Sequence, residues 1–209
     1  MGQGIRWPPR GAATTRKNPA VLGMAIEIEI KLRVPSHDPV RQALDARGAQ
    51  CHGTAIETNY ILDLPDGSLR ASGHGLRVRR IDRDGKTTAT LTVKGPSQGG
   101  SMKTREEREV AVSEAIGTVE MLRLLGYVPI LQYEKRRESW TLDDCLVELD
   151  TPPRVGLFVE IEGPSEKAVR SVQKKLGLGA QQHVERSYPR MLMAYCRDHG
   201  IDDFVLTLE

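Results

Sequence analysis

The residues in this sequence most suited to chemistry are charged and stand at every second position of short apolar runs. Residues 26–34 alternate strictly, with Ile, Leu or Val at the even positions and Glu27, Glu29, Lys31 and Arg33 at the odd ones. Such alternation is typical of a β-strand with one apolar and one charged face. A face of this kind suits contact with water, with ions, or with a highly charged ligand.

The same charged face recurs in the other expected strands. Strands are predicted over 57–63, 75–82, 87–94, 104–112, 132–141, 145–150 and 157–162. Their alternate positions, with residues 26–34, supply eight cations and eight anions. The cations are Lys31, Arg33, Arg77, Arg79, Lys94, Arg105, Lys135 and Arg137, and the anions are Glu27, Glu29, Glu107, Glu109, Glu148, Asp150, Glu160 and Glu162.

This charged face has two interpretations. An antiparallel sheet often turns its polar face to water, and any single charged residue can serve in a salt bridge. A sheet that closes into a barrel instead encloses one alternate set of side chains. Enclosed charges are costly to desolvate, so such a lining indicates a site for ions and a highly charged ligand. The periodicity permits either arrangement.

Helices and tails complete the expected architecture. Helices are predicted from Ser36 to Gly48, from Ser113 to Gly126, from Ser165 to Gly177, and from Ser187 to just before Gly200. Asp84-Gly85 predicts a hairpin turn, which excludes a purely parallel sheet. The pattern therefore predicts an antiparallel-rich α+β domain over residues 24–200. Residues 1–23 are expected to be a disordered basic tail and residues 201–209 a short C-terminal tail.

The charge balance argues against nucleic-acid binding. The chain of 209 residues has 30 Lys and Arg against 28 Asp and Glu. Four of the cations lie in residues 1–23, which contain no acid, so the body is slightly acidic. A nucleic-acid-binding surface usually has a larger basic excess. No run of 18 apolar residues predicts a membrane span. With no secretory signal in the opening residues, the cytoplasm is the expected location.

A family resemblance rests on a set of motifs in order along residues 25–195. The sequence Glu27-Ile-Glu29-Ile-Lys31 resembles the E-x-E-x-K signature of the CYTH superfamily, the triphosphate tunnel metalloenzymes. The other matching motifs are Tyr60-Ile-Leu-Asp63-Leu-Pro-Asp66, Leu76-Arg77-Val78-Arg79-Arg80, Leu91-Thr-Val-Lys94-Gly95, Arg105-Glu-Glu107-Arg-Glu109, Glu134-Lys135-Arg-Arg137, Leu149-Asp150, Phe158-Val-Glu160-Ile-Glu162-Gly163 and Arg186-Ser187-Tyr188.

The resemblance implies a fold and a site. The fold is a closed eight-stranded antiparallel β-barrel, a triphosphate tunnel with helices packed outside. Inward cations would bind a triphosphate, and inward carboxylates would hold Mg²⁺ or Mn²⁺, which prefer oxygen ligands. The implied phosphate ligands are Lys31, Arg77, Arg79, Lys94, Arg105, Lys135 and Arg137. The implied metal ligands are Glu27, Glu29, Asp150, Glu160 and Glu162, with Glu27, Glu29 and Lys31 as catalytic residues.

Two reactions fit this resemblance. The motif set is most similar to proteins grouped with the class IV adenylate cyclases, which form cyclic AMP and pyrophosphate from ATP. The alternative is a triphosphatase that hydrolyses tripolyphosphate or an organic triphosphate. A non-catalytic polyphosphate-binding module is a third interpretation, although pure anion binding has no use for so many acids. A homodimer is compatible with each of them.

Overall fold

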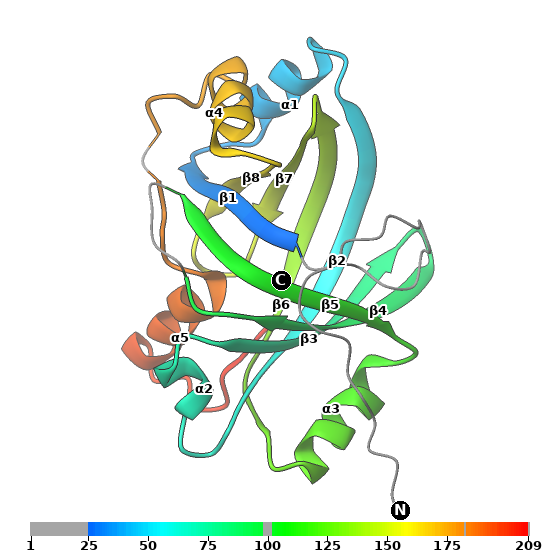
Figure 1. The fold of residues 1–209 in the computed structure, drawn as a ribbon, viewed down its shortest axis with the longest axis vertical. Coiled ribbons are helices and arrows are strands. Elements are labelled where there is room, and N and C mark those ends of the chain that lie inside the picture. Colours follow the sequence, from blue (N-terminus) through cyan, green and yellow to red (C-terminus); the bar gives the residue numbers. More distant parts are fainter. Residues whose placement is uncertain (1–24, 98–101, 182, 209) are drawn as a thin grey trace, which may run out of the picture.

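The sheet of this protein closes on itself. The computed structural model describes residues 25–97, 102–181 and 183–208, apart from the side chains of 25–27 and 103. The basic tail predicted for residues 1–23 lies outside the described part. Eight antiparallel strands follow one another around the barrel in the order β2-β3-β4-β5-β1-β8-β7-β6 (Figure 1). They are β1 (Ala25–Val34), β2 (Gln50–Asp63), β3 (Gly75–Arg83), β4 (Lys86–Lys94), β5 (Lys103–Val112), β6 (Val128–Leu142), β7 (Cys145–Thr151) and β8 (Leu157–Glu162).

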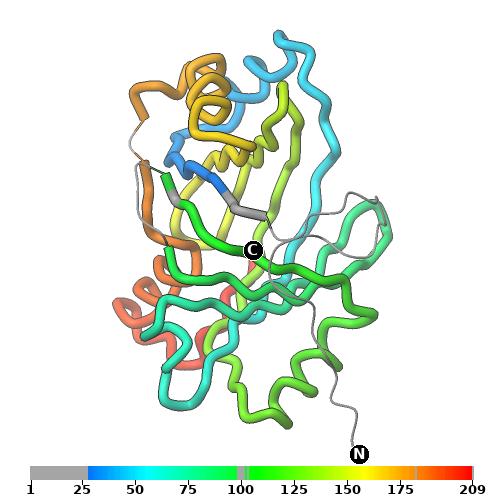
Figure 2. The backbone as a smooth tube through the Cα atoms, viewed as in Figure 1, coloured from blue at the N-terminus to red at the C-terminus, as the bar shows by residue number. Residues whose placement is uncertain are grey.

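Closure comes from the pairing of the two longest strands. Strands β2 and β6 run side by side along most of their length (Figure 2), from the pair Gln50–Thr141 to the pair Asp63–Val128. Both strands start earlier in the chain than the sequence pattern predicts. Their long antiparallel ladder joins the two ends of the sheet, which confirms the closed eight-stranded barrel.

The helices lie outside the barrel (Figure 1). Helices α1 and α4 cover one end of the barrel, and α2 and α5 lie near the other end. Helix α3 packs against β3 and β4. Helix α2, at the end of β2, is absent from the sequence prediction. The helices are α1 (Asp38–Asp45), α2 (Ser68–Ala71), α3 (Ala115–Leu124), α4 (Glu166–Lys175) and α5 (Tyr188–Asp198).

The C-terminal residues contribute to the fold. Residues 201–209 are expected to be a tail, but Val205–Leu206 form a short strand, β9, which pairs in parallel with Gln132 and Tyr133 of β6. Leu206 is buried in the cluster that also contains Leu192 of α5. Burial of this leucine explains why the segment is held against the barrel.

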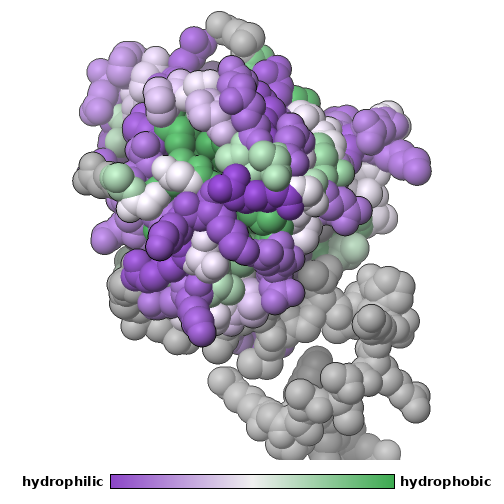
Figure 3. Space-filling model, turned by 90° about the horizontal axis from the view of Figure 1, so that it is seen from above, coloured by the Kyte–Doolittle hydropathy of each residue, from purple (hydrophilic) through white to green (hydrophobic). Residues whose placement is uncertain are grey.

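The apolar face of the sheet points outward, beneath the helices. Ile30 and Leu32 of β1 pack with Val147 and Ile161 in a cluster that includes Val169 of α4. These residues alternate with the charged ones, so the charged side chains point into the barrel. The exterior seen from above is largely hydrophilic, with smaller apolar areas between the polar residues (Figure 3).

Candidate functional site

The interior of the barrel is a cavity of about 1000 Å³ with a charged lining. The described residues that line it include ten Lys and Arg residues against seven glutamates, an excess of positive charge. We call it the central cavity. Of the predicted site residues, those that line it are Glu29, Lys31, Arg77, Arg79, Lys94, Arg105, Lys135, Arg137, Glu160 and Glu162.

Glu57, a buried glutamate that is not among the predicted site residues, organises the cations of this cavity. Its side chain on β2 is 3% exposed. Carboxylate oxygens of Glu57 lie 3.1 Å from Nη1 of Arg79, 3.3 Å from Nζ of Lys135 and 3.8 Å from Nε of Arg137. Burial alone would raise the pKa of Glu57, but these three cations hold it well below its ordinary value. Glu57 therefore stays ionised and fixes cations from two neighbouring strands.

Asp150 is on the same inward face as Arg137, but it is buried beneath other side chains and does not line the cavity. It is fully buried, and Nε and Nη2 of Arg137 donate to its two oxygens at 2.7 Å and 2.5 Å. Lys135 Nζ at 3.0 Å and the Tyr188 hydroxyl at 2.9 Å also donate to Oδ2. The family resemblance implies a metal ligand at Asp150. With both oxygens held in this way, its position suits the anchoring of cations.

The predicted carboxylates gather where β1 meets β8. Glu29 is the cross-strand partner of Glu162, and Lys31 is the partner of Glu160. Directly opposed residues on one face have neighbouring side chains, so Glu29 and Glu162 form a pair of oxygen donors. Glu160 is held by Lys31 Nζ at 3.1 Å and by Nη2 of Arg137 at 2.6 Å. The side chain of Glu27 lies outside the described residues.

This carboxylate pair fits a hard divalent cation. Among the described residues, no three acidic, His or Cys side chains are close enough together to hold a metal by themselves. Magnesium commonly uses one or two protein carboxylates and takes its other ligands from water and substrate phosphates. The pair of Glu29 and Glu162, facing a cation-rich cavity, meets that requirement.

The part of the barrel wall formed by β3, β4 and β5 holds its cations in a similar way. Lys94 Nζ lies 2.5 Å from an oxygen of Glu107, its cross-strand partner. Arg77 lies 3.5 Å from Glu109, whose other neighbour is the hydroxyl of Thr92 at 2.6 Å. Burial and the charge of nearby Arg79 lower the pKa of Arg77. Arginine ionises so strongly that it stays charged despite this shift.

Tyr188, at the start of α5, contacts both lysines of the cluster. The Nζ atoms of Lys31 and Lys135 lie 4.0 Å and 5.0 Å from the centre of its ring. Lys31 also donates to the carbonyl oxygen of Arg186, at 3.3 Å. Burial, followed by the charge of Asp150, raises the pKa of Tyr188 well above its ordinary value, so its hydroxyl stays protonated and donates. The segment leading into α5 thus fixes the lysine positions.

Glu148 is a further glutamate of the cavity lining whose burial affects its ionisation. It forms an ion pair with Nη1 of Arg137. Burial nevertheless raises the pKa of Glu148 to about 7, with nearby Asp150 contributing.

Besides Asp150, Arg33 is a described member of the charged face that does not line the cavity. Arg33 is at the end of β1, is exposed, and donates to the carbonyl oxygen of Val155 at 2.6 Å. Its guanidinium lies 4.8 Å from the centre of the Phe158 ring. The parity of β1 places Arg33 on the charged face, but this position is beyond the rim of the cavity.

The sequence held a signal for Glu57. Glu57 is two residues before Asn59 and therefore on the same face of the strand. Asn59 accepts a hydrogen bond from Arg79 Nε at 3.2 Å. The pairing of Glu57 with Lys135 across β2 and β6 is what places it among the cations. Tyr133 and Tyr188 also line the cavity, and no charged pattern indicates them.

The fold and this lining agree with a known class of protein. The CYTH domain model matches residues 25–188, and the chain therefore belongs to the CYTH family. Among relatives, the chain is 27% identical over 175 residues to adenylate cyclase CyaB of Aeromonas hydrophila, covering 78% of this chain and 86% of the relative.

Solved structures show the same fold. A protein from Pyrococcus horikoshii superposes with a TM-score of 0.72 at 26% identity, covering 81% of this chain and 99% of that one. A Hippeastrum protein reported to have a dominant triphosphatase activity superposes with a TM-score of 0.64 at 20% identity, covering 81% of this chain and 96% of that one. Separately, none of the helices in the described ranges has the length and apolar character needed to cross a membrane.

Proposed function

We propose that this protein is a metal-dependent enzyme that binds ATP in the central cavity and forms cyclic AMP and pyrophosphate, as a class IV adenylate cyclase does. The observation that carries this proposal is the lining itself, with ten cations and seven glutamates around one cavity inside a closed barrel. An excess of fixed positive charge in a partly enclosed site favours a compact, highly charged anion.

The phosphate ligands in this proposal form two groups around the cavity. Arg79, Lys135 and Arg137 form one group around Glu57, while Arg77 and Lys94, on β3 and β4, form the other. A chain of phosphates that reaches both groups would meet cations along its length. Arginine adds bidentate geometry, and the internal ion pairs keep each side chain in place before substrate arrives. Lys31 and Arg105 complete the phosphate-binding set.

The metal ligands are proposed to be Glu29 and Glu162, with Glu27 and Glu160 adjoining them. A bound Mg²⁺ or Mn²⁺ ion would neutralise charge on the phosphate oxygens. Asp150, predicted as a ligand, is assigned here to holding Lys135 and Arg137.

The residues of the chain act mainly by positioning the reactants. In the cyclisation, the ribose 3′-hydroxyl oxygen forms a bond to the α-phosphorus, the bond from that phosphorus to pyrophosphate breaks, and the hydroxyl proton passes to water. Glu29 would orient that hydroxyl, while Lys31 and Arg137 would stabilise the charge that grows on the phosphate oxygens.

An apolar region of the cavity favours a nucleotide over inorganic tripolyphosphate. Ile61, Ile130 and Met193 line it and belong to one apolar cluster. Inorganic tripolyphosphate has no apolar surface to place there. The named adenylate cyclase relative supports the same choice. The alternative, triphosphate hydrolysis, is favoured by the fold shared with the Hippeastrum protein, because one tunnel can serve both reactions.

Parallel assays distinguish the two reactions. Purified protein is incubated with ATP or with tripolyphosphate, in the presence of Mg²⁺ or Mn²⁺, and both cyclic AMP and orthophosphate are measured. The proposal expects cyclic AMP from ATP without release of orthophosphate. Orthophosphate from tripolyphosphate, with no cyclic AMP from ATP, would identify a triphosphatase. Binding without either product would identify a non-catalytic module.

A further inference from the structure

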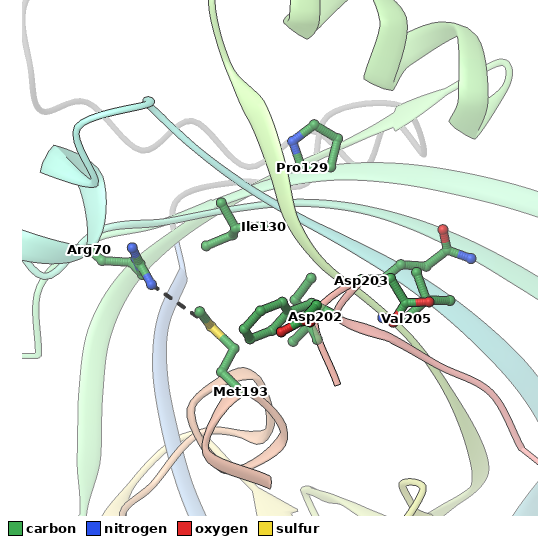
Figure 4. Close-up of a pocket in the computed structure, with 10 residues that line it drawn as sticks. Arg70, Pro129, Ile130, Met193, Asp202, Asp203 and Val205 are labelled. Atoms are coloured by element: carbon green, nitrogen blue, oxygen red, sulfur yellow. Dashed lines mark hydrogen bonds between the residues drawn. The ribbon is translucent and has the colours of Figure 1, made fainter. Parts of the chain in front are cut away.

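A second, smaller pocket adjoins the central cavity. It has a volume of about 400 Å³ and lies between Arg70 of α2, β6, Met193 of α5 and the residues just before β9 (Figure 4). We call it the side pocket. Arg70, Ile130 and Met193 line both the side pocket and the central cavity, so the two spaces meet at these three residues.

Arg70 is held in a fixed orientation at this junction. Its Nε lies 2.8 Å from Oδ2 of Asp63, which is fully buried. The other oxygen of Asp63 accepts the backbone N–H of Leu69 at 3.0 Å, so the turn that carries Arg70 is fixed as well. Nη1 of Arg70 approaches the sulfur of Met193 at 3.9 Å (Figure 4). Half of the Arg70 side chain remains exposed, so part of the planar guanidinium is open to a ligand.

Across the side pocket from Arg70 lie two exposed carboxylates. Asp202 and Asp203 precede β9 and line the pocket with Ile130 between them and Arg70 (Figure 4). Asp203 accepts the backbone N–H of Val205 at 3.3 Å, which fixes its position. The pocket therefore combines the planar guanidinium of Arg70, apolar side chains, and the carboxylate oxygens of Asp202 and Asp203 as hydrogen-bond acceptors.

We propose that the side pocket binds the adenine base of the substrate, and that Arg70 and Asp202 determine base specificity. This inference rests on the proposed function, because it places a nucleotide with its phosphates in the central cavity. A purine ring can stack on the guanidinium of Arg70 and pack against Ile130 and Met193. The exocyclic amine of adenine donates to a carboxylate, whereas guanine has a carbonyl oxygen at that position, which a carboxylate repels.

The experiment compares ligands with and without a base. Binding of α,β-methylene-ATP, its guanosine counterpart and imidotriphosphate is measured by calorimetry in the presence of Mg²⁺. The methylene bridge of the two nucleotide analogues prevents cyclisation, and the imido bridge of imidotriphosphate resists hydrolysis. Arg70→Ala is expected to weaken α,β-methylene-ATP binding about tenfold and to leave imidotriphosphate binding within about twofold. Arg80→Ala is the matched control, since Arg80 is equally exposed and pairs with Asp82 on the outer face.

A second variant changes Asp202 and leaves the ion pair between Arg70 and the buried Asp63 intact. Asp202 is exposed, so Asp202→Asn should fold normally, and it is expected to reduce the preference for the adenine over the guanine analogue about threefold. Equal weakening of both ligands by Arg70→Ala would make Arg70 a phosphate contact and overturn the proposal, as would unchanged binding of both. If the wild-type protein bound imidotriphosphate but not α,β-methylene-ATP, the proposed ATP substrate would fail together with this pocket.

Discussion

Arg137 and Asp150 are cross-strand partners on β6 and β7, and their side chains are joined by two hydrogen bonds of 2.7 Å and 2.5 Å. Burial opposes the charge of Arg137, but Asp150, Glu148 and Glu57 outweigh that effect and raise its pKa well above the ordinary value. The pair is therefore a fixed element of the cavity wall. It connects a residue that lines the central cavity to one that is fully buried and does not line it.

The first prediction separates anchoring by Asp150 from metal binding. Asp150→Asn should lower the free energy of unfolding by about 3 kcal/mol, because Arg137 and Lys135 lose a buried counter-charge. The loss should appear with a chelator present, measured by denaturant unfolding. Asp82→Asn, which removes an ion pair on the outer face, should cost less than about 1 kcal/mol. If the variant were as stable as the wild type in the absence of metal, Asp150 would not anchor these cations and would again be a candidate metal ligand.

The second prediction concerns Glu57 and acid stability. Because its pKa is lowered in the folded state, its stabilising effect is present above the ordinary value of 4.5 and is lost as the pH falls below it. Glu57→Gln should lower stability at pH 7 by about 3 kcal/mol and flatten the decline below pH 4.5. Unfolding curves at several pH values test this, with the exposed Glu106→Gln as control. A variant whose acid sensitivity matches the wild type would contradict the assignment.

The third prediction concerns the carboxylates at β1 and β8. Glu29→Gln should abolish metal-dependent turnover, because an amide is a weaker ligand for a hard cation than a carboxylate. Turnover is followed over a range of Mg²⁺ and Mn²⁺ concentrations. Glu106→Gln again serves as the control, since Glu106 pairs with Arg108 on the outer face. Retention of most activity in Glu29→Gln would remove this residue from the metal site.

The fourth prediction compares two adjacent arginines of β3. Arg79 lines the cavity, while Arg80 points to the outer face. Arg79→Ala should raise KM for ATP about tenfold or more, because it removes charge-assisted hydrogen bonds to phosphate. Arg80→Ala should leave KM near the wild-type value. Steady-state kinetics of both variants provide the test, and equal values of KM would mean that Arg79 does not contact the substrate.

The strands and the set of charged residues could be predicted from the sequence. The alternation at Glu29 and Lys31 has a period of two, which is a local property of extended chain. That property places Arg77 with Arg79, and Lys135 with Arg137, whatever the rest of the fold does. The resemblance to the CYTH family added the direction in which this face points, and the closed barrel confirms it.

Which of these charges meet depends on contacts between distant segments of the chain. The ladder between β2 and β6 joins residues far apart in the sequence and brings Glu57 beside Lys135. The start of α5 places the Tyr188 hydroxyl on Asp150, a carboxylate that is fully buried and does not line the cavity. No local pattern contains these pairings, because strand register and barrel closure fix them through contacts between distant segments. Alternation along each strand is enough to produce a charged face, and the closure of the sheet makes that face the lining of a cavity.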